Sequence, residues 1–461
     1  MRSSFALALA AVLCAAALVS ARSYATITVY PRHGEPSDGL VPPTGPGVVV
    51  MGGGQDVDDA FRWMQARTAD ANGAGGDVVV LRDPDTHVGR DDAYAPYLLS
   101  LAKFNSVQTV VLADPVTTAE LAQAAALVDR AEAVFFGGGD QRHYVLWRGA
   151  LLDAVQRVYD RRGVVGGTSA GGALWGEIVN DAIGEYRHGS TTSANAIADP
   201  FEPSITFTSG LFRIPGLAGA ITDSHFHARD RFGRLAAFVA RIAGGGIVGA
   251  PRATGLGVDE DSALLVDERG VAMLALYAPG RGGAWIVRGG TPHDLAAGHA
   301  LSYDVAVTRL DAVGQRFDLA SGCGDGASYD VSIDGTKTPA YAPVDPYGAP
   351  SKGGTCGELD AGPPPAMVDA AAQPDSAFDG GAAGDTGGAV DTPAYAQGVT
   401  GCTCTAGVAR QDSGAWLLLL AFVAAALRRN KDFMHRVGVI LAGAWRTTPS
   451  SASSSSRVIR R

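Results

Sequence analysis

Five short apolar runs alternate with helical patterns over residues 47–175, and this alternation restricts the possible folds more than any other feature of the sequence. Strands that are buried on both faces have no polar face, so they read as unbroken apolar runs. The segments between the runs carry apolar side chains at helical spacing, at residues 56–69, 118–131 and 146–159. This order predicts an α/β fold with a doubly wound, mostly parallel sheet. The runs are Val48–Met51, Val78–Leu81, a stretch within Val107–Leu112, Ala133–Phe136 and Val164–Val165.

The pattern becomes mixed after residue 206. A helix is predicted at Leu235–Ile242, and strands are predicted at 255–259, 263–266, 271–277 and 284–287, the last two closing a β-meander. The regular pattern fades beyond residue 311, so the folded domain is predicted at 47–310, between an entry segment (26–46) and an extension (311–356). Residues 357–400 are rich in Gly, Ala, Pro and Asp and have few large apolar side chains. Such a composition cannot bury a core, which predicts a disordered linker.

The first 25 residues have the layout of a secretion signal. Arg2 precedes an apolar stretch from Phe5 to Val19, and small residues at Ser20–Ala21 or at Ala25 offer a cleavage site. A short buried helix is the alternative explanation of the same stretch. The signal predicts an exported protein, either secreted or associated with the cell surface or outer membrane.

Residues 401–461 fall into three parts. Gly401–Cys404 precede an apolar run from Trp416 to Leu427, which Arg428–Arg429 close. This run is shorter than the roughly 20 residues that a membrane-spanning helix needs. Residues 401–429 resemble the C-terminal sorting signals of myxobacteria, which implies processing at the cysteine and attachment to the surface by a sorting machinery. A basic, Ser-rich tail follows at 430–461, where such signals usually have already ended.

Charge and cysteine content narrow the possible partners. The net charge of -10 would repel phosphate backbones, so no nucleic-acid partner is expected. Cys14 lies in the signal, and the other four cysteines all lie in the C-terminal third: Cys323, Cys356, Cys402 and Cys404. Cys323 and Cys356 are a candidate disulfide in an oxidising compartment, although spacing alone leaves the connectivity open.

The clearest chemical pattern is Val-Val-Gly-Gly-Thr-Ser-Ala-Gly-Gly-Ala-Leu-Trp at residues 164–175. A strand, a sharp turn and a helix start are the layout of a nucleophile elbow, whose small neighbours let the chains approach each other. We therefore predict that Ser169 is a nucleophile and that the helix after it adds a positive dipole end near the oxyanion. A glycine-rich turn without function is the alternative. The N–H groups of Ala170 and of Gly138 or Gly139 are candidate oxyanion donors, because these glycines end a predicted strand.

A serine nucleophile needs a base and a carboxylate that orients the base. The segment from Asp223 to Arg229 holds His225 and His227, which alternate as on a strand or an extended loop. Two nearby histidines also allow a metal pair, but no third ligand has a suitable spacing, so no metal is predicted. Asp259-Glu260-Asp261 follows a Gly-rich predicted strand and offers the carboxylate, with a surface acidic turn as the alternative.

Four segments follow one another in a recognisable order: Phe-Phe-Gly-Gly-Gly-Asp-Gln (135–141), Gly-Thr-Ser-Ala-Gly (167–171), Asp-x-His-Phe-x-x-Arg-x-Arg-x-Gly-Arg-Leu (223–235) and Gly-Leu-Gly-Val-Asp-Glu-Asp (255–261). Together they resemble cyanophycinase and its relatives in peptidase family S51, over residues 47 to about 290. The resemblance implies a class I glutamine amidotransferase-like, three-layer αβα fold. It also implies a triad of Ser169, His225 and Glu260, with Glu185 as an alternative third member. Gln141, Asp223 and Arg229 match the substrate-pocket positions of the family, and Ala170 and Gly139 would bind the oxyanion.

By this resemblance, the chain would cut cyanophycin or related aspartyl-arginine peptides to dipeptides through an acyl-enzyme, without a cofactor, and it would form a homodimer. Ser224 departs from the family, which usually has Gln before the triad histidine. The lost amide leaves a different S51-type exopeptidase for Asp-containing peptides as an alternative. A catalytically inactive surface-binding protein is a further alternative, against which the three triad residues argue.

Overall fold

The structure is a computed structural model, and it describes residues 27–39, 44–70, 72–84, 92–184, 191–245 and 253–348. All of these residues belong to the first of two compact units, Met1–Ala372. The second unit, Gln373–Arg461, contains none of them. The predicted secretion signal, linker, sorting signal and basic tail therefore lie outside the described residues.

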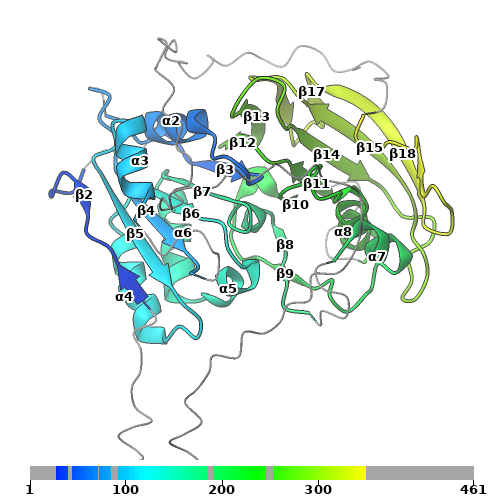
Figure 1. The fold of residues 1–461 in the computed structure, drawn as a ribbon, viewed down its shortest axis with the longest axis horizontal. Helices are drawn as coiled ribbons and strands as arrows, with labels where there is room; N and C mark the ends of the chain where they lie inside the picture. The colour runs from blue at the N-terminus through cyan, green and yellow to red at the C-terminus, as the bar shows by residue number, and fades with distance from the viewer. Residues whose placement is uncertain are drawn as a thin grey trace, which may run out of the picture. The chain divides into compact units, whose positions relative to one another are not determined.

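Five parallel strands form the centre of the first sheet (Figure 1). Their spatial order is β5-β4-β6-β7-β3, and every neighbouring pair in this series is parallel. Each predicted apolar run is one of these strands, so the parallel core of the predicted α/β fold is confirmed. Because their carboxyl ends share one edge, the glycine-rich turns after β3, β7 and β6 lie side by side. The strands are β3 (Gly47–Met51), β4 (Asp77–Arg82), β5 (Ser106–Leu112), β6 (Ala133–Phe136) and β7 (Val164–Thr168).

Antiparallel strands extend this sheet at both edges, so it is a mixed sheet rather than the mostly parallel one that we predicted. At one edge, β1 (Ile27–Val29) and β2 (His33–Gly34) pair with β5, which makes the predicted entry segment part of the sheet. At the other edge, β12 pairs with β3, and three further strands follow in the order β13-β16-β17. These strands are β12 (Ser262–Asp267), β13 (Val271–Leu276), β16 (Arg316–Asp318) and β17 (Cys323–Gly324).

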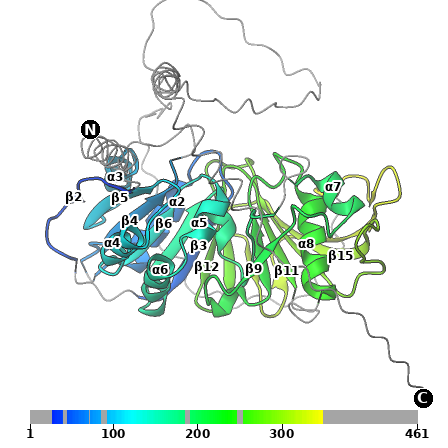
Figure 2. The same ribbon diagram turned by 90° about the horizontal axis from the view of Figure 1, so that it is seen from below.

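Helices cover both faces of the parallel strands (Figure 2). Alternate residues of each strand point to opposite faces. Val49, Val80 and Phe135 accordingly share a core with α2 (Asp58–Arg67) and α3 (Tyr94–Leu101). Their strand neighbours pack in another core with α4 (Thr118–Val128) and α6 (Ala150–Asp160). The α4 helix begins as predicted, because Thr117 and Glu120 form a reciprocal capping box.

The helix predicted at 146–159 is interrupted in the structure. Two helices, α5 (Gln141–Leu146) and α6, are separated at Gly149, whose φ of 89° lies in the left-handed region. A residue with that φ cannot continue a right-handed helix, and glycine adopts it at little cost. The apolar side chains of α6 recur at helical spacing, so the sequence pattern alone did not reveal this break.

Six strands from the later part of the chain build a second sheet, which appears green to yellow in Figure 1. Its order is β10-β11-β14-β15-β18-β19, with only β10 and β11 parallel. Helices α7 (Ser193–Ala198) and α8 (Phe232–Gly244) share a hydrophobic core with it. Before β10 in the chain, β8 (Ile178–Asn180) and β9 (Phe207–Ser209) form a separate two-stranded sheet. The six strands are β10 (Ala220–Asp223), β11 (Thr254–Val258), β14 (Ala284–Gly289), β15 (Ser302–Leu310), β18 (Ala327–Asp334) and β19 (Tyr341–Ala342).

Two sequence expectations for this region are wrong. The segments at 271–277 and 284–287 do not close one meander, because β13 belongs to the first sheet and β14 to the second. The regular pattern also does not end at residue 311, since the described part of the chain has four strands beyond it. Three of the four have only two or three residues, too few to show a period of two in the sequence.

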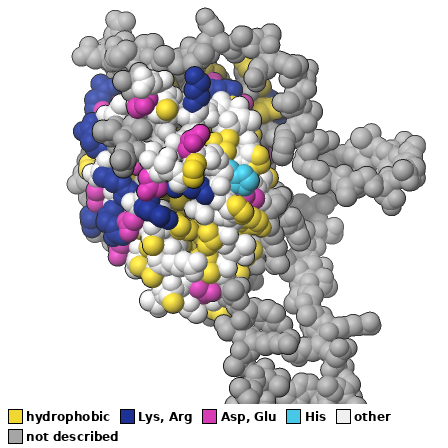
Figure 3. All heavy atoms as spheres, turned by 90° about the vertical axis from the view of Figure 1, so that its left-hand side faces the viewer, with side chains coloured by type: hydrophobic (Ala, Val, Ile, Leu, Met, Phe, Trp, Pro, Cys, Tyr) yellow, Lys and Arg dark blue, Asp and Glu magenta, His cyan; other side chains and the backbone are white. Residues whose placement is uncertain are grey.

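The described surface is mixed in character. Acidic and basic side chains are interspersed with apolar ones on the face that β2 and α4 border (Figure 3). Within the described ranges, no helix combines the length and apolar composition needed to cross a membrane. Cys323 in β17 is disulfide-bonded, and the other four cysteines of the chain lie outside the described residues.

Candidate active site

Ser169 lies at the carboxyl end of β7 in a strained turn. Its φ is 55°, in the left-handed region that non-glycine residues rarely adopt, and its N–H donates to the Met51 carbonyl at 3.2 Å. Glycines make the turn possible. A Cβ on Gly167 would lie 2.5 Å from the Gly171 carbonyl oxygen, and one on Gly171 would lie 2.4 Å from that of Phe136. The predicted close approach of the chains around the serine is therefore present.

The helix expected after Ser169 is reduced to a single 3-10 turn, Gly172–Leu174. Glycine disfavours the helical state, and Gly171, Gly172 and Gly176 all lie within seven residues of the serine. The predicted dipole of a full α-helix is thus wrong. The individual N–H groups of the turn remain as electrostatic elements.

His225 faces Ser169 from the turn that follows β10. The serine Oγ lies 2.7 Å from Nε2 of His225, and Nδ1 of the same ring lies 2.6 Å from Oε1 of Glu260. With Nδ1–H donating to the carboxylate, the Nε2 lone pair is free to accept the serine proton. The structure therefore joins the three predicted triad residues in one hydrogen-bonded chain.

The segment around His225 is a tight turn and not the extended segment that we expected. His225 itself has a φ of 46°, so His225 and His227 do not alternate on a strand. The imidazole of His227 instead lies 4.7 Å from the ring of Tyr347 and is 59% exposed. Among the described residues, no group of three or more His, Cys, Asp or Glu side chains is arranged to hold a metal.

The glycine loop after β3, Gly52–Gly54, holds the histidine in place. The Gly52 carbonyl accepts the His225 N–H at 2.7 Å, and Gly53 has a φ of +100°. A Cβ on Gly53 would lie 2.3 Å from Cε1 of His225, so only glycine leaves room for the imidazole. The sequence showed these glycines as the end of a strand but gave no sign of their contact with the histidine.

Glu260 lies in the link between β11 and β12. Its side chain is 38% exposed, and Nε of Arg229 lies 3.9 Å from its Oε1 atom. The adjacent carboxylates have other contacts: Asp259 accepts backbone N–H groups of the histidine turn, and Asp261 accepts the Gln55 N–H at 2.7 Å. Glu185, the alternative third member, lies outside the described residues.

Burial sets the charge of His225. Loss of solvent lowers the pKa of its imidazole, and the positive charges of Arg229 and Arg231 act in the same direction. The hydrogen bond and negative charge of Glu260 oppose this shift without cancelling it. The imidazole is thus kept neutral near neutral pH, the state in which it can accept a proton.

The candidate oxyanion donors flank the serine. A Cβ on Gly138 would lie 3.5 Å from Cβ of Ser169, whereas one on Gly139 would meet Asp83 and the Tyr144 hydroxyl. Gly138, rather than Gly139, is therefore the glycine that lies against the nucleophile. Neither the Gly138 nor the Ala170 N–H has a hydrogen-bond partner among the described residues, so both are free to donate to a ligand.

The three predicted pocket residues have different environments. Gln141 begins α5, and its side-chain amide donates to the Asn180 carbonyl. Asp223 is buried, and its carboxylate binds Arg234 Nε at 2.7 Å and Arg231 at 3.4 Å. These arginines hold the pKa of Asp223 below its usual value against the opposing effect of burial. Asp223 thus forms a buried ion pair, and its predicted contact with substrate stays a prediction. Arg229 is half-exposed beside Glu260.

Sequence reasoning missed a polar cluster beside the nucleophile. Asp56, two residues after the glycine loop, hydrogen-bonds Tyr94 and Thr168, and burial raises its pKa to about 6. The guanidinium of Arg82 lies 5.1 Å from the Tyr94 ring centroid. The available signal was the position of Asp56 and Arg82 at the carboxyl ends of parallel strands, where such sheets place their sites.

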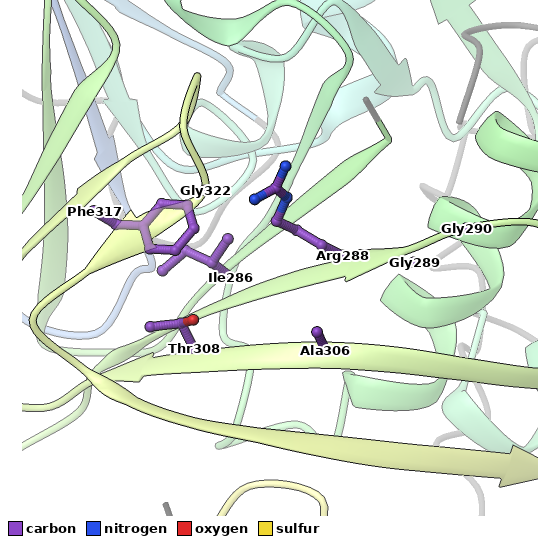
Figure 4. A pocket seen from close by; sticks show the side chains of 8 residues that line it. All are labelled: Ile286, Arg288, Gly289, Gly290, Ala306, Thr308, Phe317 and Gly322. Carbon is purple, nitrogen blue, oxygen red and sulfur yellow. The ribbon is translucent and has the colours of Figure 1, made fainter. Parts of the chain in front are cut away.

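A separate cavity of about 270 Å³ lies on the second sheet (Figure 4). It contains no residue of the Ser169–His225–Glu260 chain. Its lining residues are Ile286, Arg288, Gly289, Gly290, Ala306, Thr308, Phe317 and Gly322.

An α/β fold with a serine at a strained strand end, hydrogen-bonded to a histidine and a carboxylate, is the arrangement that serine hydrolases use. The chain is similar to cyanophycinases. It is 28% identical over 273 residues to the cyanophycinase of Synechococcus elongatus, which covers 56% of this chain and 72% of that protein. It is 30% identical over 154 residues to the cyanophycinase of Trichormus variabilis, which covers 33% of this chain and 44% of that protein. This similarity supports the assignment of the chain as a hydrolase of the peptidase class.

No family model matches the chain. Two solved structures are similar to it at low identity. A peptidase from an acI-B1 actinobacterium is 14% identical with a TM-score of 0.31, covering 54% of this chain and 92% of that one. A peptidase E-like protein from Listeria monocytogenes is 12% identical with a TM-score of 0.31, covering 51% of this chain and 100% of that one.

Proposed function

We propose that the chain is a serine-type peptidase of the cyanophycinase kind, with Ser169 as nucleophile. The observation that carries the proposal is the continuous chain of hydrogen bonds from Ser169 through His225 to Glu260. Ser169 attacks an amide carbonyl while His225 takes its proton, and Glu260 stabilises the imidazolium that forms. The N–H groups of Gly138 and Ala170 stabilise the oxyanion. Water then hydrolyses the acyl-enzyme.

The proposed substrates are aspartyl peptides, with cyanophycin as the first candidate because the similar proteins are cyanophycinases. Basic side chains line the turn beside the triad, and half-exposed Arg229 is placed to bind a substrate carboxylate. Gln141 would orient an amide of the same substrate. We also propose that the fold is of the class I glutamine amidotransferase-like type. We propose further that the protein forms a homodimer.

Ser169→Ala tests the proposal. We expect the purified variant to bind cyanophycin or β-aspartyl dipeptides while its kcat falls by a factor on the order of 10⁴ or more, because the nucleophile is absent. Binding is measured by calorimetry and cleavage by release of dipeptide. Full activity of the variant would rule out Ser169 as nucleophile.

A second substrate assignment is favoured by Ser224. Its hydroxyl lies 3.4 Å from Arg231 next to the triad histidine, where the cyanophycinase resemblance predicts the longer amide of Gln. The shorter serine lacks the amide that the resemblance expects in the substrate pocket, so the second assignment is an S51-type exopeptidase for Asp-containing peptides. Comparing kcat/KM for cyanophycin with that for aspartyl dipeptides and tripeptides separates the two assignments.

We also propose that the protein is exported. The disulfide at Cys323 supports this, because such bonds persist in oxidising compartments and are rare in reducing ones. Mass spectrometry of the extracellular and membrane fractions should then find the protein without its first 20–25 residues. Intact Met1 on the mature protein would contradict export through this signal.

A further inference from the structure

The turn at residues 224–231, which connects β10 to α8 and carries His225, is strained at two positions. His225 and Asp230 each have a φ of 46°. A left-handed backbone costs about 1–2 kcal/mol at a residue other than glycine. Such a turn keeps its shape only if its surroundings restrain it.

Asp259, the first of the three acidic residues after β11, is one restraint on the turn. The Asp259 carboxylate accepts the N–H groups of His227 and Ala228 at 3.0 and 2.9 Å. This contact fixes the middle of the turn on the side of the first sheet's glycine loop. It leaves the far end of the turn, where α8 begins, to another partner.

Ser193 contacts this end, because its hydroxyl binds the Asp230 carbonyl and the Gly233 N–H. A second partner is Tyr347, which lies more than a hundred residues further along the chain. Its hydroxyl accepts the Phe232 N–H at 2.9 Å and donates to the Asp230 carboxylate at 3.0 Å. The Phe226 carbonyl lies 3.4 Å from the same hydroxyl. The hydroxyl of Tyr347 thus contacts the turn at Phe226, just after His225, and at the strained residue Asp230. It also contacts Phe232, the first residue of α8.

The ring of Tyr347 reinforces these bonds. Its centroid lies 5.6 Å from that of Phe226, 4.7 Å from that of His227 and 5.7 Å from that of Phe232. Burial raises the pKa of the Tyr347 phenol well above its usual value, so the hydroxyl keeps its proton and stays a donor.

The second sheet in turn holds Tyr347. Its carbonyl accepts the indole N–H of Trp285 in β14 at 3.0 Å and a guanidinium N–H of Arg309 in β15 at 3.3 Å. The hydroxyl of Tyr329 in β18 donates to the preceding carbonyl, that of Pro346, at 2.9 Å. Three strands therefore fix the position from which Tyr347 reaches the turn.

We propose that Tyr347 is a positioning residue for His225, and that it connects the second sheet to the turn that presents the imidazole to Ser169. This rests on the proposed function, in which His225 is the base. Tyr347 acts through the turn, without contact with Ser169 or Glu260 in the described structure. The segment after β18 is thus part of the working site and not an appendage to the peptidase core.

The test compares Tyr347→Phe with Tyr303→Phe in the full-length chain. Both changes remove one buried phenol oxygen, but the Tyr303 hydroxyl has no hydrogen-bond partner among the described residues and lies in β15, away from the turn. We expect Tyr347→Phe to lower kcat about tenfold with KM within about twofold, because a small misplacement of the base slows proton transfer more than binding. Tyr303→Phe should keep the parent kcat.

A histidine NMR titration adds a readout that needs no substrate, with the resonance assigned by a His225→Gln variant. The groups facing His225 are Ser169, Glu260, Arg229 and Arg231, and none of them is changed. In Tyr347→Phe we expect a looser, better hydrated turn and a higher midpoint for His225. Tyr329→Phe, which frees the Pro346 carbonyl and loses the contact with the Trp285 side chain, should give a smaller shift in the same direction and serves if Tyr347→Phe does not fold.

Parent values of both kcat and the His225 midpoint in Tyr347→Phe would overturn the proposal. A lower melting temperature without any change in the midpoint would also overturn it, because that outcome means a structural role only. If the parent chain cleaves no peptide, the proposed function fails, whereas the titration still decides whether Tyr347 positions the imidazole.

Discussion

Three consecutive carboxylates at residues 259–261 perform three different tasks. Glu260 accepts a hydrogen bond from the imidazole of His225, and Asp259 accepts backbone N–H groups of the histidine turn. Asp261 accepts the Gln55 N–H at the end of the glycine loop. Composition cannot distinguish these roles, because all three residues offer the same chemistry. The directions of their side chains follow from the backbone of the link, in which Asp261 has a φ of 62°.

The charge of His225 predicts how activity depends on pH. Burial lowers its pKa from the ordinary 6.5, and only the neutral imidazole accepts the serine proton. Activity is therefore present above the lowered pKa and is lost as pH falls through it. We expect the acid limb of kcat/KM to have its midpoint below 6.5, measured between pH 4 and about 8 with a stable buffer series.

Asp56 provides the control for this profile, because its pKa is raised to about 6 and it hydrogen-bonds Thr168, the residue before the nucleophile. In Asp56→Asn the acid limb should remain where it is. Loss of the limb in that variant would assign it to Asp56, and a midpoint above 6.5 in the parent would contradict a buried, neutral base.

At the scale of elements, the glycine loop after β3 governs the placement of the histidine. Gly53→Ala would put a Cβ 2.3 Å from Cε1 of His225 at a φ of +100°. The imidazole has to move, since its ring is the more mobile of the two groups in contact. We expect kcat to fall on the order of 10²-fold, which matches the cost of a displaced catalytic group.

Gly210→Ala is the matched control for the backbone part of this change. Gly210 also has a positive φ, of +64°, but no heavy atom would lie within 4 Å of an added Cβ. Both variants should lose about 1–2 kcal/mol of stability from the left-handed backbone, measured by urea unfolding. Only Gly53→Ala should lose activity, and equal activity of the two variants would contradict the contact with His225.

The elements differ in how far the sequence could predict them. The strands β3 to β7 are buried on both faces, so their apolar runs marked them clearly. The single turn after Ser169 and the break at Gly149 depend on particular glycines inside patterns that otherwise favour helix. The triad residues were predicted through the order of four motifs, whereas the contacts of Asp56 and of Gly53 with the site arise only when distant segments meet.

At the scale of the whole molecule, the second sheet was the least predictable part. Its strands β15 and β18 alternate buried and exposed residues, yet their partners β14 and β19 are separated from them by loops of varied length. The fold also returns to the first sheet through β16 and β17 between β15 and β18. Such non-local pairing leaves little trace in local sequence patterns, so the predicted domain ended too early, at residue 310.

This topology predicts that a chain ended after residue 310 does not fold, whereas one ended after residue 356 does. The shorter chain loses the buried side chains of Phe317, Tyr329, Val331, Ile333 and Tyr347. At about 1.5–3 kcal/mol for each buried side chain, the loss is on the order of 10 kcal/mol, comparable with the whole stability of a typical domain. It also exposes an edge of β15 that β18 covers in the intact protein.

Circular dichroism melts and size-exclusion chromatography of the two chains check this prediction. We expect cooperative unfolding and a defined hydrodynamic size for the longer chain, and aggregation or a non-cooperative melt for the shorter one. A soluble, cooperatively folded and active 310-residue chain would show that the second sheet's outer strands are dispensable. It would also remove the support that Tyr347 is proposed to give His225, because the site would then work without it.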